Sequence, residues 1–174
     1  MIEALNQDKI KEKCGVFGVF LDKSEEKSAS EFAYYGMLAL QHRGKEASGI
    51  AVSKDGKISA YKGLGSVSSV FTKEILDSLE GNVALGHVLY SNKAVSHKNV
   101  EPFVSSTLFG ELAIAHNGAL TNYSELRQKL LENGETFVSE SESEIIAKLI
   151  LSHSKHKFEK ALTEAITMLQ GSFA

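Results

Sequence analysis

The chain of 174 residues carries 43% hydrophobic and 24% charged residues, with a net charge of -3. This composition predicts one globular domain with a hydrophobic core and excludes a disordered chain. Charges of both signs are interspersed, so no basic surface for nucleic acid or for an anionic membrane is expected. No apolar run reaches the roughly 18 residues of a membrane span, and residues 1–13 lack the apolar centre of a signal peptide. We therefore predict a cytoplasmic protein.

The first half of the chain predicts a sheet with helices beside it. Asp55-Gly56 between two strand-like runs is a strong signal for a β-hairpin. The expected elements are a strand at 14–20, a helix at 30–41, hairpin strands at 48–53 and 57–62, a helix at 72–79 and a strand at 83–90.

The second half predicts more helix. Asn122 and Ser141 each precede a glutamate by three residues, the spacing of a capping box at a helix start. Gly171 is expected to cap the last helix, and a new element begins at 172–174, so we expect a larger protein. The other expected elements are a loop at 91–102, a strand at 108–116 and helices at 122–134, 141–150 and 158–170. Strands clustered before and between helices favour an α+β layered domain over a doubly wound parallel sheet.

Cys14 is the one cysteine of the chain. It cannot form an internal disulfide, and no second thiol supports a zinc or iron–sulfur site in this segment. A lone cysteine on a strand is more often a small core residue than a nucleophile. Cys14 is therefore either part of the core or the centre of the chemistry.

Four stretches place polar residues and glycine beside strand ends, where binding groups are commonly presented. His-Arg-Gly at 42–44 is also typical of a helix end, and Asn117-Gly118 of a simple turn. As chemistry, Asn117 and Gly118 would supply an amide and a backbone N–H to an oxyanion. The four stretches are 14–15, 41–44, 86–90 and 116–118.

Two ways of activating Cys14 stay open. His42, His87 and His116 are candidate bases for a Cys/His pair, and no spacing singles one out. If residues 1–13 were removed instead, the new α-amine of Cys14, with a pKa of about 8, would accept the thiol proton directly or through a water.

Five motifs follow one another along the chain: CGVFGVF behind the short leader, LQHRGKEASGIAV, GHVLYSN, IAHNGALTNYSELRQKL and SESESEII. In order and spacing they resemble the class II glutamine amidotransferase domain of the amidophosphoribosyltransferase family, over nearly all of residues 14–174. The resemblance implies an N-terminal-nucleophile (Ntn) hydrolase fold with four layers, αββα, in which two antiparallel sheets pack together. It also implies a leader or propeptide at 1–13 that is removed before Cys14 acts.

The resemblance further implies hydrolysis of glutamine to glutamate and ammonia, which serves phosphoribosylamine formation in purine biosynthesis. It makes Cys14 the nucleophile, places Asn117 and Gly118 at the oxyanion and Arg43 beside the nucleophile. A phosphoribosyltransferase domain is expected after residue 174, and a homo-oligomer is expected. Any magnesium or iron–sulfur site would lie in that later part, so no cofactor or metal is expected in this segment. The matching motifs place four residues at the substrate: Leu89, Asn92, His116 and Glu142.

The substrate motifs depart from the family pattern. Leu89 replaces an arginine that resembles the clamp for the glutamine α-carboxylate, and leucine offers no hydrogen-bond donor. Loss of such a pair costs on the order of 2 to 5 kcal/mol if its partner stays buried. Glu142 replaces an aspartate that receives the α-ammonium, Asn92 replaces a threonine, and Lys45 replaces a glutamine.

Three hypotheses follow. The chain is a working glutaminase domain in which Lys45, Lys93 or another cation replaces the arginine, or it is a divergent relative that acts on another amide. Alternatively, it is a non-catalytic domain that regulates or binds a partner. Retention of Cys14, Arg43 and the Asn-Gly pair favours the first two, and we take the glutaminase as the main prediction.

Overall fold

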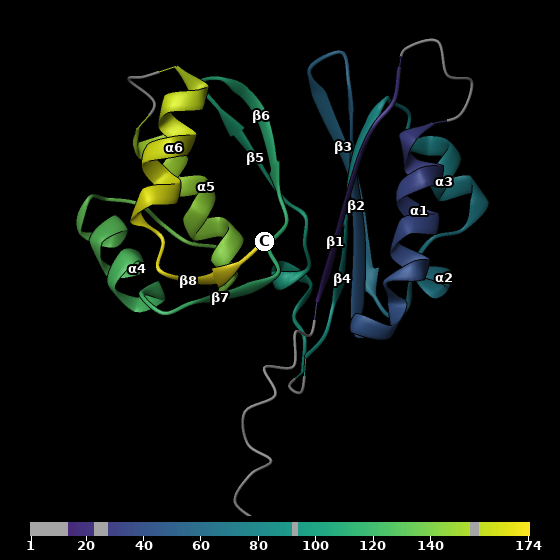
Figure 1. The fold of residues 1–174 in the computed structure, drawn as a ribbon, viewed down its shortest axis with the longest axis horizontal. Coiled ribbons are helices and arrows are strands. Elements are labelled where there is room, and N and C mark those ends of the chain that lie inside the picture. Colours follow the sequence, from purple (N-terminus) through teal and green to yellow (C-terminus); the bar gives the residue numbers. More distant parts are fainter. Residues whose placement is uncertain (1–13, 23–27, 92–93, 154–156) are drawn as a thin grey trace, which may run out of the picture.

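The computed structural model describes residues 14–22, 28–91, 94–153 and 157–174. Its elements form two halves, and each half has a sheet on the inside and helices on the outside (Figure 1). The predicted leader, 1–13, lies outside the described residues, as do Asn92 and Lys93. None of the described helices has the length and apolar character needed to span a bilayer.

The first half is one antiparallel sheet covered on its outer face by helices. The strand order is β1-β4-β2-β3. Asp55 and Gly56 both have positive φ, 49° and 81°, as a two-residue type I′ hairpin requires, so the predicted hairpin is confirmed. The elements are β1 (Gly15–Phe20), α1 (Ala29–Ala39), η1 (Gln41–Arg43), β2 (Ala47–Lys54), β3 (Lys57–Leu64), α2 (Val67–Val70), α3 (Lys73–Ser78) and β4 (Val83–Leu89).

The second half has shorter strands and longer helices. Two strand pairs, β5-β6 and β7-β8, are both antiparallel. The elements are η2 (His97–Asn99), β5 (Phe103–Thr107), β6 (Gly110–Ile114), β7 (Gly118–Leu120), α4 (Tyr123–Glu132), α5 (Glu142–Ser152), α6 (Phe158–Met168) and β8 (Gly171–Phe173).

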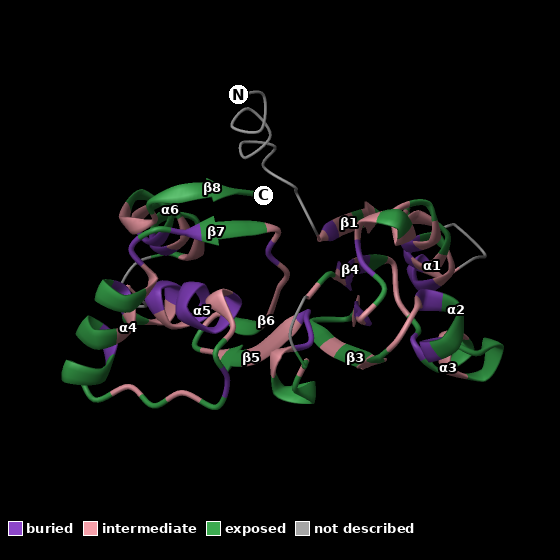
Figure 2. Cartoon of the chain, turned by 90° about the horizontal axis from the view of Figure 1, so that it is seen from below, coloured by how far each residue is buried: buried purple, intermediate pink, exposed green. Residues whose placement is uncertain are grey.

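Each half has its own hydrophobic core between sheet and helices (Figure 2). Met37 of α1 packs with Ile50 and Val52 of β2 in the first, and Leu130 of α4 packs with Ile145 of α5 in the second. The order of layers is therefore helices, sheet, sheet, helices, which confirms the α+β prediction (Figure 1).

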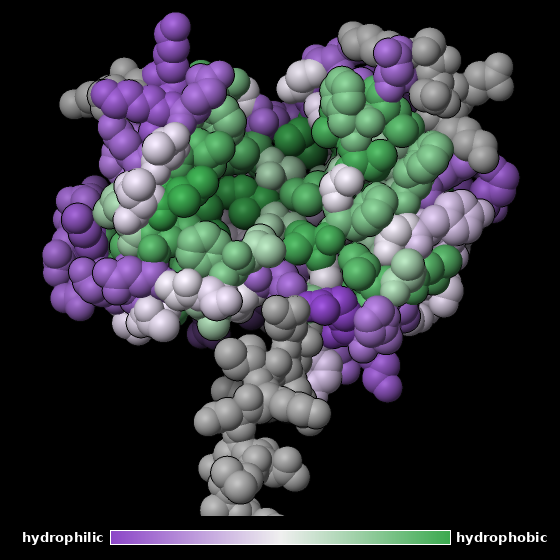
Figure 3. Space-filling model, in the orientation of Figure 1, coloured by the Kyte–Doolittle hydropathy of each residue, from purple (hydrophilic) through white to green (hydrophobic). Residues whose placement is uncertain are grey.

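Apolar side chains also gather between the two halves, on the inner faces of the sheets (Figure 3). A cavity of about 550 Å³ lies there, lined by residues of all four strands of the first sheet together with Ala113 of β6. The inner face of the first sheet is therefore apolar although it carries no helix.

The strand expected at 108–116 is present as β6, and it forms a hairpin with β5 in which Thr107 Oγ1 donates to the Gly110 carbonyl at 2.7 Å across the turn. Three other predictions about local structure were wrong. Asn117-Gly118 starts the extended strand β7 instead of forming a turn, and Gly171 starts β8 instead of capping α6. The Asn122 side chain does not cap α4, because it bonds residues after α6.

Candidate active site

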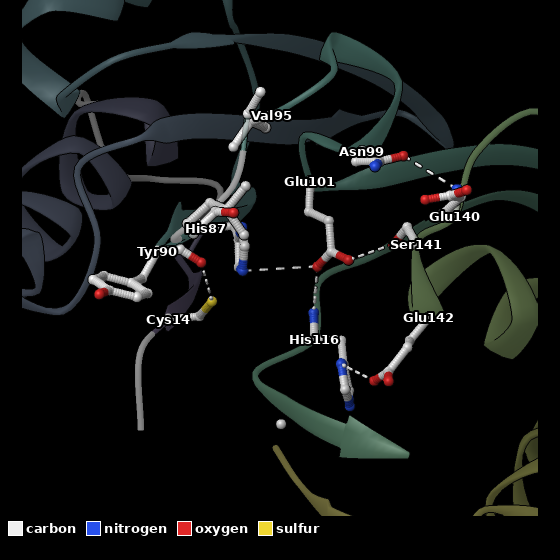
Figure 4. A pocket seen from close by; sticks show the side chains of 14 residues that line it. Cys14, His87, Tyr90, Val95, Asn99, Glu101, His116, Glu140, Ser141 and Glu142 are labelled. Carbon is white, nitrogen blue, oxygen red and sulfur yellow. Dashed lines mark hydrogen bonds and ion pairs between the residues drawn. The ribbon is translucent and has the colours of Figure 1, made fainter. Parts of the chain in front are cut away.

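A pocket of about 240 Å³ opens where the two halves meet (Figure 4). Its walls come from the start of β1, the end of β4, the loop before β5, the residues around the start of β7 and the start of α5. Of the residues predicted at the site, five line it: Cys14, Leu89, His116, Gly118 and Glu142. Residues that are far apart in the sequence are thus brought to one cavity.

Cys14 lies at the entrance to β1 with its side chain half-buried. Its Sγ is 4.0 Å from the carbonyl oxygen of Tyr90, and its own carbonyl accepts a 2.7 Å hydrogen bond from Arg43 Nε. Burial raises the pKa of the Cys14 thiol, the Tyr90 contact opposes this rise, and the charge of Glu101 reinforces it. The thiol as it stands is therefore not activated, and it needs a base to become a nucleophile at neutral pH.

Arg43 belongs to the stretch 41–44, which contacts both Cys14, just before β1, and Leu89, at the end of β4. Gln41 accepts a hydrogen bond from Val67 N at 2.7 Å and donates to the Gly44 carbonyl. A Cβ at residue 44 would lie 2.4 Å from the main chain of Leu89, so only glycine permits this approach. Arg43 therefore contacts the main chain of Cys14, and its role at the nucleophile stays a prediction.

The histidine alternatives do not provide a base in contact with Cys14. His87 is buried in the pocket wall, and burial lowers its pKa against the opposing charge of Glu101. His116 lies beside Glu142, and His42 is exposed outside the residues that line the pocket. Among the described residues no histidine hydrogen-bonds to Cys14 Sγ, which disfavours a Cys/His pair.

Gly118 presents its N–H to the pocket because of its place in β7. Asn117 and Ala174 exchange both of their N–H···O bonds, at 3.0 and 2.8 Å. In an antiparallel ladder the next N–H points to the opposite edge, so that of Gly118 is directed away from β8. The N–H of Leu120, two residues on, points the same way and donates to Glu142 Oε1 at 3.1 Å. Because the Asn117 N–H is used by Ala174, Asn117 itself can offer only its side-chain amide, and Asn117 is not among the described residues that line the pocket.

His116 and Glu142 form a polar wall beside Gly118. His116 Nδ1 lies 3.2 Å from Glu142 Oε2. His116 Nε2 is buried and has no hydrogen-bond partner among the described residues, and Glu142 Oε2 has only this ion pair. Because buried polar atoms are nearly always paired, His116 Nε2 marks a place where a polar ligand would bind.

The lysines predicted to replace the missing arginine are not among the described residues that line the pocket. Leu89 lines the pocket, where it offers an apolar contact only. Lys45 is exposed and is not among the lining residues, and Lys93 lies outside the described residues, as does Asn92.

One residue of the site escaped the sequence analysis. Glu101 is 7% exposed and lies in the pocket wall between His87, His116 and Ser141 (Figure 4). It falls in a stretch that the sequence presented as a plain loop. The sequence did offer a signal for Glu101: it is an acidic residue beside the single proline, and it lies between two motifs that contribute residues to the pocket.

The layered α+β fold, with Cys14 in a pocket between its halves, is the arrangement of an amidotransferase domain, and the comparisons show this family. The family model described as a glutamine amidotransferase domain matches residues 87–174, half of the chain. The chain belongs to this family.

Among curated relatives, it is 42% identical over 169 residues to amidophosphoribosyltransferase 2, chloroplastic, of Arabidopsis thaliana, covering 96% of this chain and 29% of that protein. It is 41% identical over 166 residues to the amidophosphoribosyltransferase of Methanocaldococcus jannaschii, covering 92% and 34%. The chain thus spans about a third of the length of these relatives.

Solved structures carry the same fold. Glutamine phosphoribosylpyrophosphate amidotransferase from B. subtilis matches with a TM-score of 0.81 and 36% identity, covering 91% of this chain and 34% of that one. A structure described as the allosteric regulatory enzyme of purine biosynthesis matches with a TM-score of 0.84 and 35% identity over the same shares. The predicted Ntn hydrolase fold is confirmed by these likenesses.

Proposed function

We propose that this chain hydrolyses the side-chain amide of glutamine to glutamate and ammonia. The observation that carries the proposal is the meeting of Cys14, Gly118 and Glu142 in one pocket of a glutamine amidotransferase domain. A nucleophile, an oxyanion donor and an acceptor for an ammonium group are thereby placed around one small ligand.

The base in this proposal is the α-amine of Cys14, released when residues 1–13 are removed. Two observations support it: the pKa of the thiol is raised by burial, and no described histidine hydrogen-bonds to Sγ. The amine takes the thiol proton, and Sγ attacks the side-chain carbonyl carbon of glutamine.

The Gly118 N–H and the Asn117 side-chain amide stabilise the oxyanion that forms. The C–N bond then breaks, the amine returns its proton to the leaving nitrogen, and ammonia departs from a thioester. Water attacks the thioester, which releases glutamate and restores the thiol. These steps need no metal or cofactor from this segment, and we propose that this segment binds none.

Substrate binding rests on Glu142 and His116. The carboxylate of Glu142 would accept the α-ammonium, with His116 Nδ1, 3.2 Å from Oε2, holding the carboxylate in place. Leu89 leaves the α-carboxylate without a guanidinium on that wall, so we expect weak binding of glutamine.

For the whole protein, we propose that ammonia passes to a phosphoribosyltransferase domain in the same polypeptide, for phosphoribosylamine formation in purine biosynthesis. The names of the relatives support this assignment. A homo-oligomer and a cytoplasmic location stay proposals drawn from the sequence.

The test is a glutaminase assay combined with intact mass after incubation with diazo-oxo-norleucine, an electrophile that resembles glutamine. We expect a chain without residues 1–13, one adduct on Cys14, and release of ammonia from glutamine. Cys14→Ala should abolish both the adduct and the ammonia. A processed and folded chain that neither takes the adduct nor releases ammonia would refute the proposal.

A further inference from the structure

We infer that Glu101 is a positioning residue, whose buried carboxylate holds the substrate-binding wall of the second half in register with the nucleophile of the first. The expected effect of Glu101 on the reaction rate rests on the proposed hydrolysis. Its positioning role rests on geometry alone. The reacting groups come from both halves, with Cys14 in the first and Gly118 and Glu142 in the second. A displacement of about 1 Å between such groups costs roughly 100-fold in rate, so a joint between the halves matters.

Each oxygen of Glu101 binds the second half. Oε1 accepts hydrogen bonds from the hydroxyls of Ser141 and Ser143, at 2.6 and 2.7 Å. Oε2 accepts the N–H of His116 at 2.7 Å. Ser141 and Ser143 flank Glu142, and His116 directly precedes Asn117. The single carboxylate thus fixes both the ammonium acceptor and the oxyanion segment.

The main chain around Glu101 is held by the first half. Lys62 Nζ of β3 donates to the carbonyls of Val100 and Pro102, at 2.6 and 3.3 Å. At Gly49 of β2, a Cβ would lie 2.1 Å from the Glu101 carbonyl oxygen, so the strand and this residue are in close contact. Glu101 is therefore anchored on the first sheet while its side chain reaches the second half.

The charge of Glu101 also acts on the first half. Its Oε2 lies 3.8 Å from His87 Nε2 of β4. The same charge raises the pKa of the Cys14 thiol and opposes the effect of burial on the pKa of Lys62. A buried carboxylate is costly unless it is well hydrogen-bonded, and three short donors meet this need here.

The experiment compares Glu101→Ala and Glu101→Gln by amide hydrogen exchange at His116, by kcat/KM for glutamine, and by the pH midpoint of Cys14 alkylation with iodoacetamide. Glu101→Ala should speed exchange at His116 by at least tenfold and lower kcat/KM by roughly 100-fold. Glu101→Gln should keep both within tenfold, because its amide oxygen still accepts from His116 and serine hydroxyls also accept hydrogen bonds. The loss of charge in Glu101→Gln should move the alkylation midpoint to lower pH.

Glu46→Gln is the matched control, since Glu46 also raises the pKa of Cys14 without bonding the second half. It should lower the alkylation midpoint and leave His116 exchange unchanged. Exchange at His116 that is as slow in Glu101→Ala as in the wild type would overturn the inference. If Glu101→Ala does not fold, Ser143→Ala decides, since the Ser143 hydroxyl bonds Glu101 whereas Ser141 also caps α5: faster exchange around Glu142 supports the joint, and unchanged exchange refutes it. Exchange and alkylation do not require turnover, so loss of the glutaminase proposal would be seen separately.

Discussion

The two halves of the molecule differ in the length of their strand pairing, although each has its own hydrophobic core. In the first half, β2 and β3 pair over eight residues each, and an apolar core lies between the sheet and α1. In the second half, β7 and β8 have three residues each, and side chains tie distant segments together. Asn122, for example, donates to the Met168 carbonyl and accepts from Gln170 N.

The two halves also contribute different groups to the pocket. The half with the long ladder carries Cys14, the proposed nucleophile, whereas the other half carries Gly118 and Glu142, the proposed oxyanion donor and ammonium acceptor. We expect substitutions at the pocket, in either half, to change activity, and loss of a polar tie such as that of Asn122 to change stability. The following predictions test that comparison.

The largest effect is expected for Gly118→Ala. A Cβ at 118 would lie 2.2 Å from the Ser172 carbonyl oxygen and 2.6 Å from Phe173 Cα, so β7 must move away from β8 and carry its N–H with it. Loss of one oxyanion donor costs roughly 100- to 1000-fold in kcat. Gly18→Ala of β1, whose Cβ would meet nothing within 4 Å, is the control and should stay near wild type in a glutaminase assay.

Asn122→Ala should lower the free energy of unfolding by about 2 kcal/mol, since two hydrogen bonds at a 9% exposed residue are lost. Asn122→Asp keeps the acceptor for Gln170 N and loses the donor to Met168, so an intermediate loss is expected. Urea unfolding measures both. Equal stability of all three proteins would show that β8 is held by its ladder alone.

Leu89→Arg should raise kcat/KM for glutamine by about tenfold or more, because a guanidinium in the pocket wall would pair with the α-carboxylate. Leu89→Met, which changes shape without adding a donor, should show no gain. Steady-state kinetics with glutamine decide the matter. A folded Leu89→Arg protein without a gain would mean that the wall binds the substrate in another way.

The smallest effect is the pH dependence that His87 contributes to stability. Burial lowers the pKa of His87, so the unfolded chain binds a proton more readily than the folded one. This stability is complete above the ordinary histidine pKa of about 6.5 and is lost as the pH falls below it, by at most about 1.4 kcal/mol per pH unit. In His87→Phe, urea unfolding between pH 7 and 5 should show a flatter profile. The same slope in both proteins would assign the dependence to other groups.

Sequence reasoning was most successful where structure depends on neighbours in the chain. The Asp55-Gly56 hairpin and the helix near 30–41 follow from turn chemistry and periodicity, and both are present. It failed at Asn122, Asn117-Gly118 and Gly171, because their local signals also suit caps and turns. In each case a contact from a segment roughly 50 residues away decided the outcome, such as Asn117 with Ala174.

By itself, the sequence determined the class of fold and pointed to Cys14 and four other residues that line the pocket, because motifs and hydrophobic periodicity are properties of contiguous residues. Only the tertiary structure decided which N–H reaches the pocket, that the three histidines leave Cys14 without a contacting base, and that Glu101 bridges the halves. Each of these depends on how a residue's neighbours in space share its donors and acceptors. The linear order of residues carries no record of that sharing, since a buried carboxylate and an exposed one are the same letter.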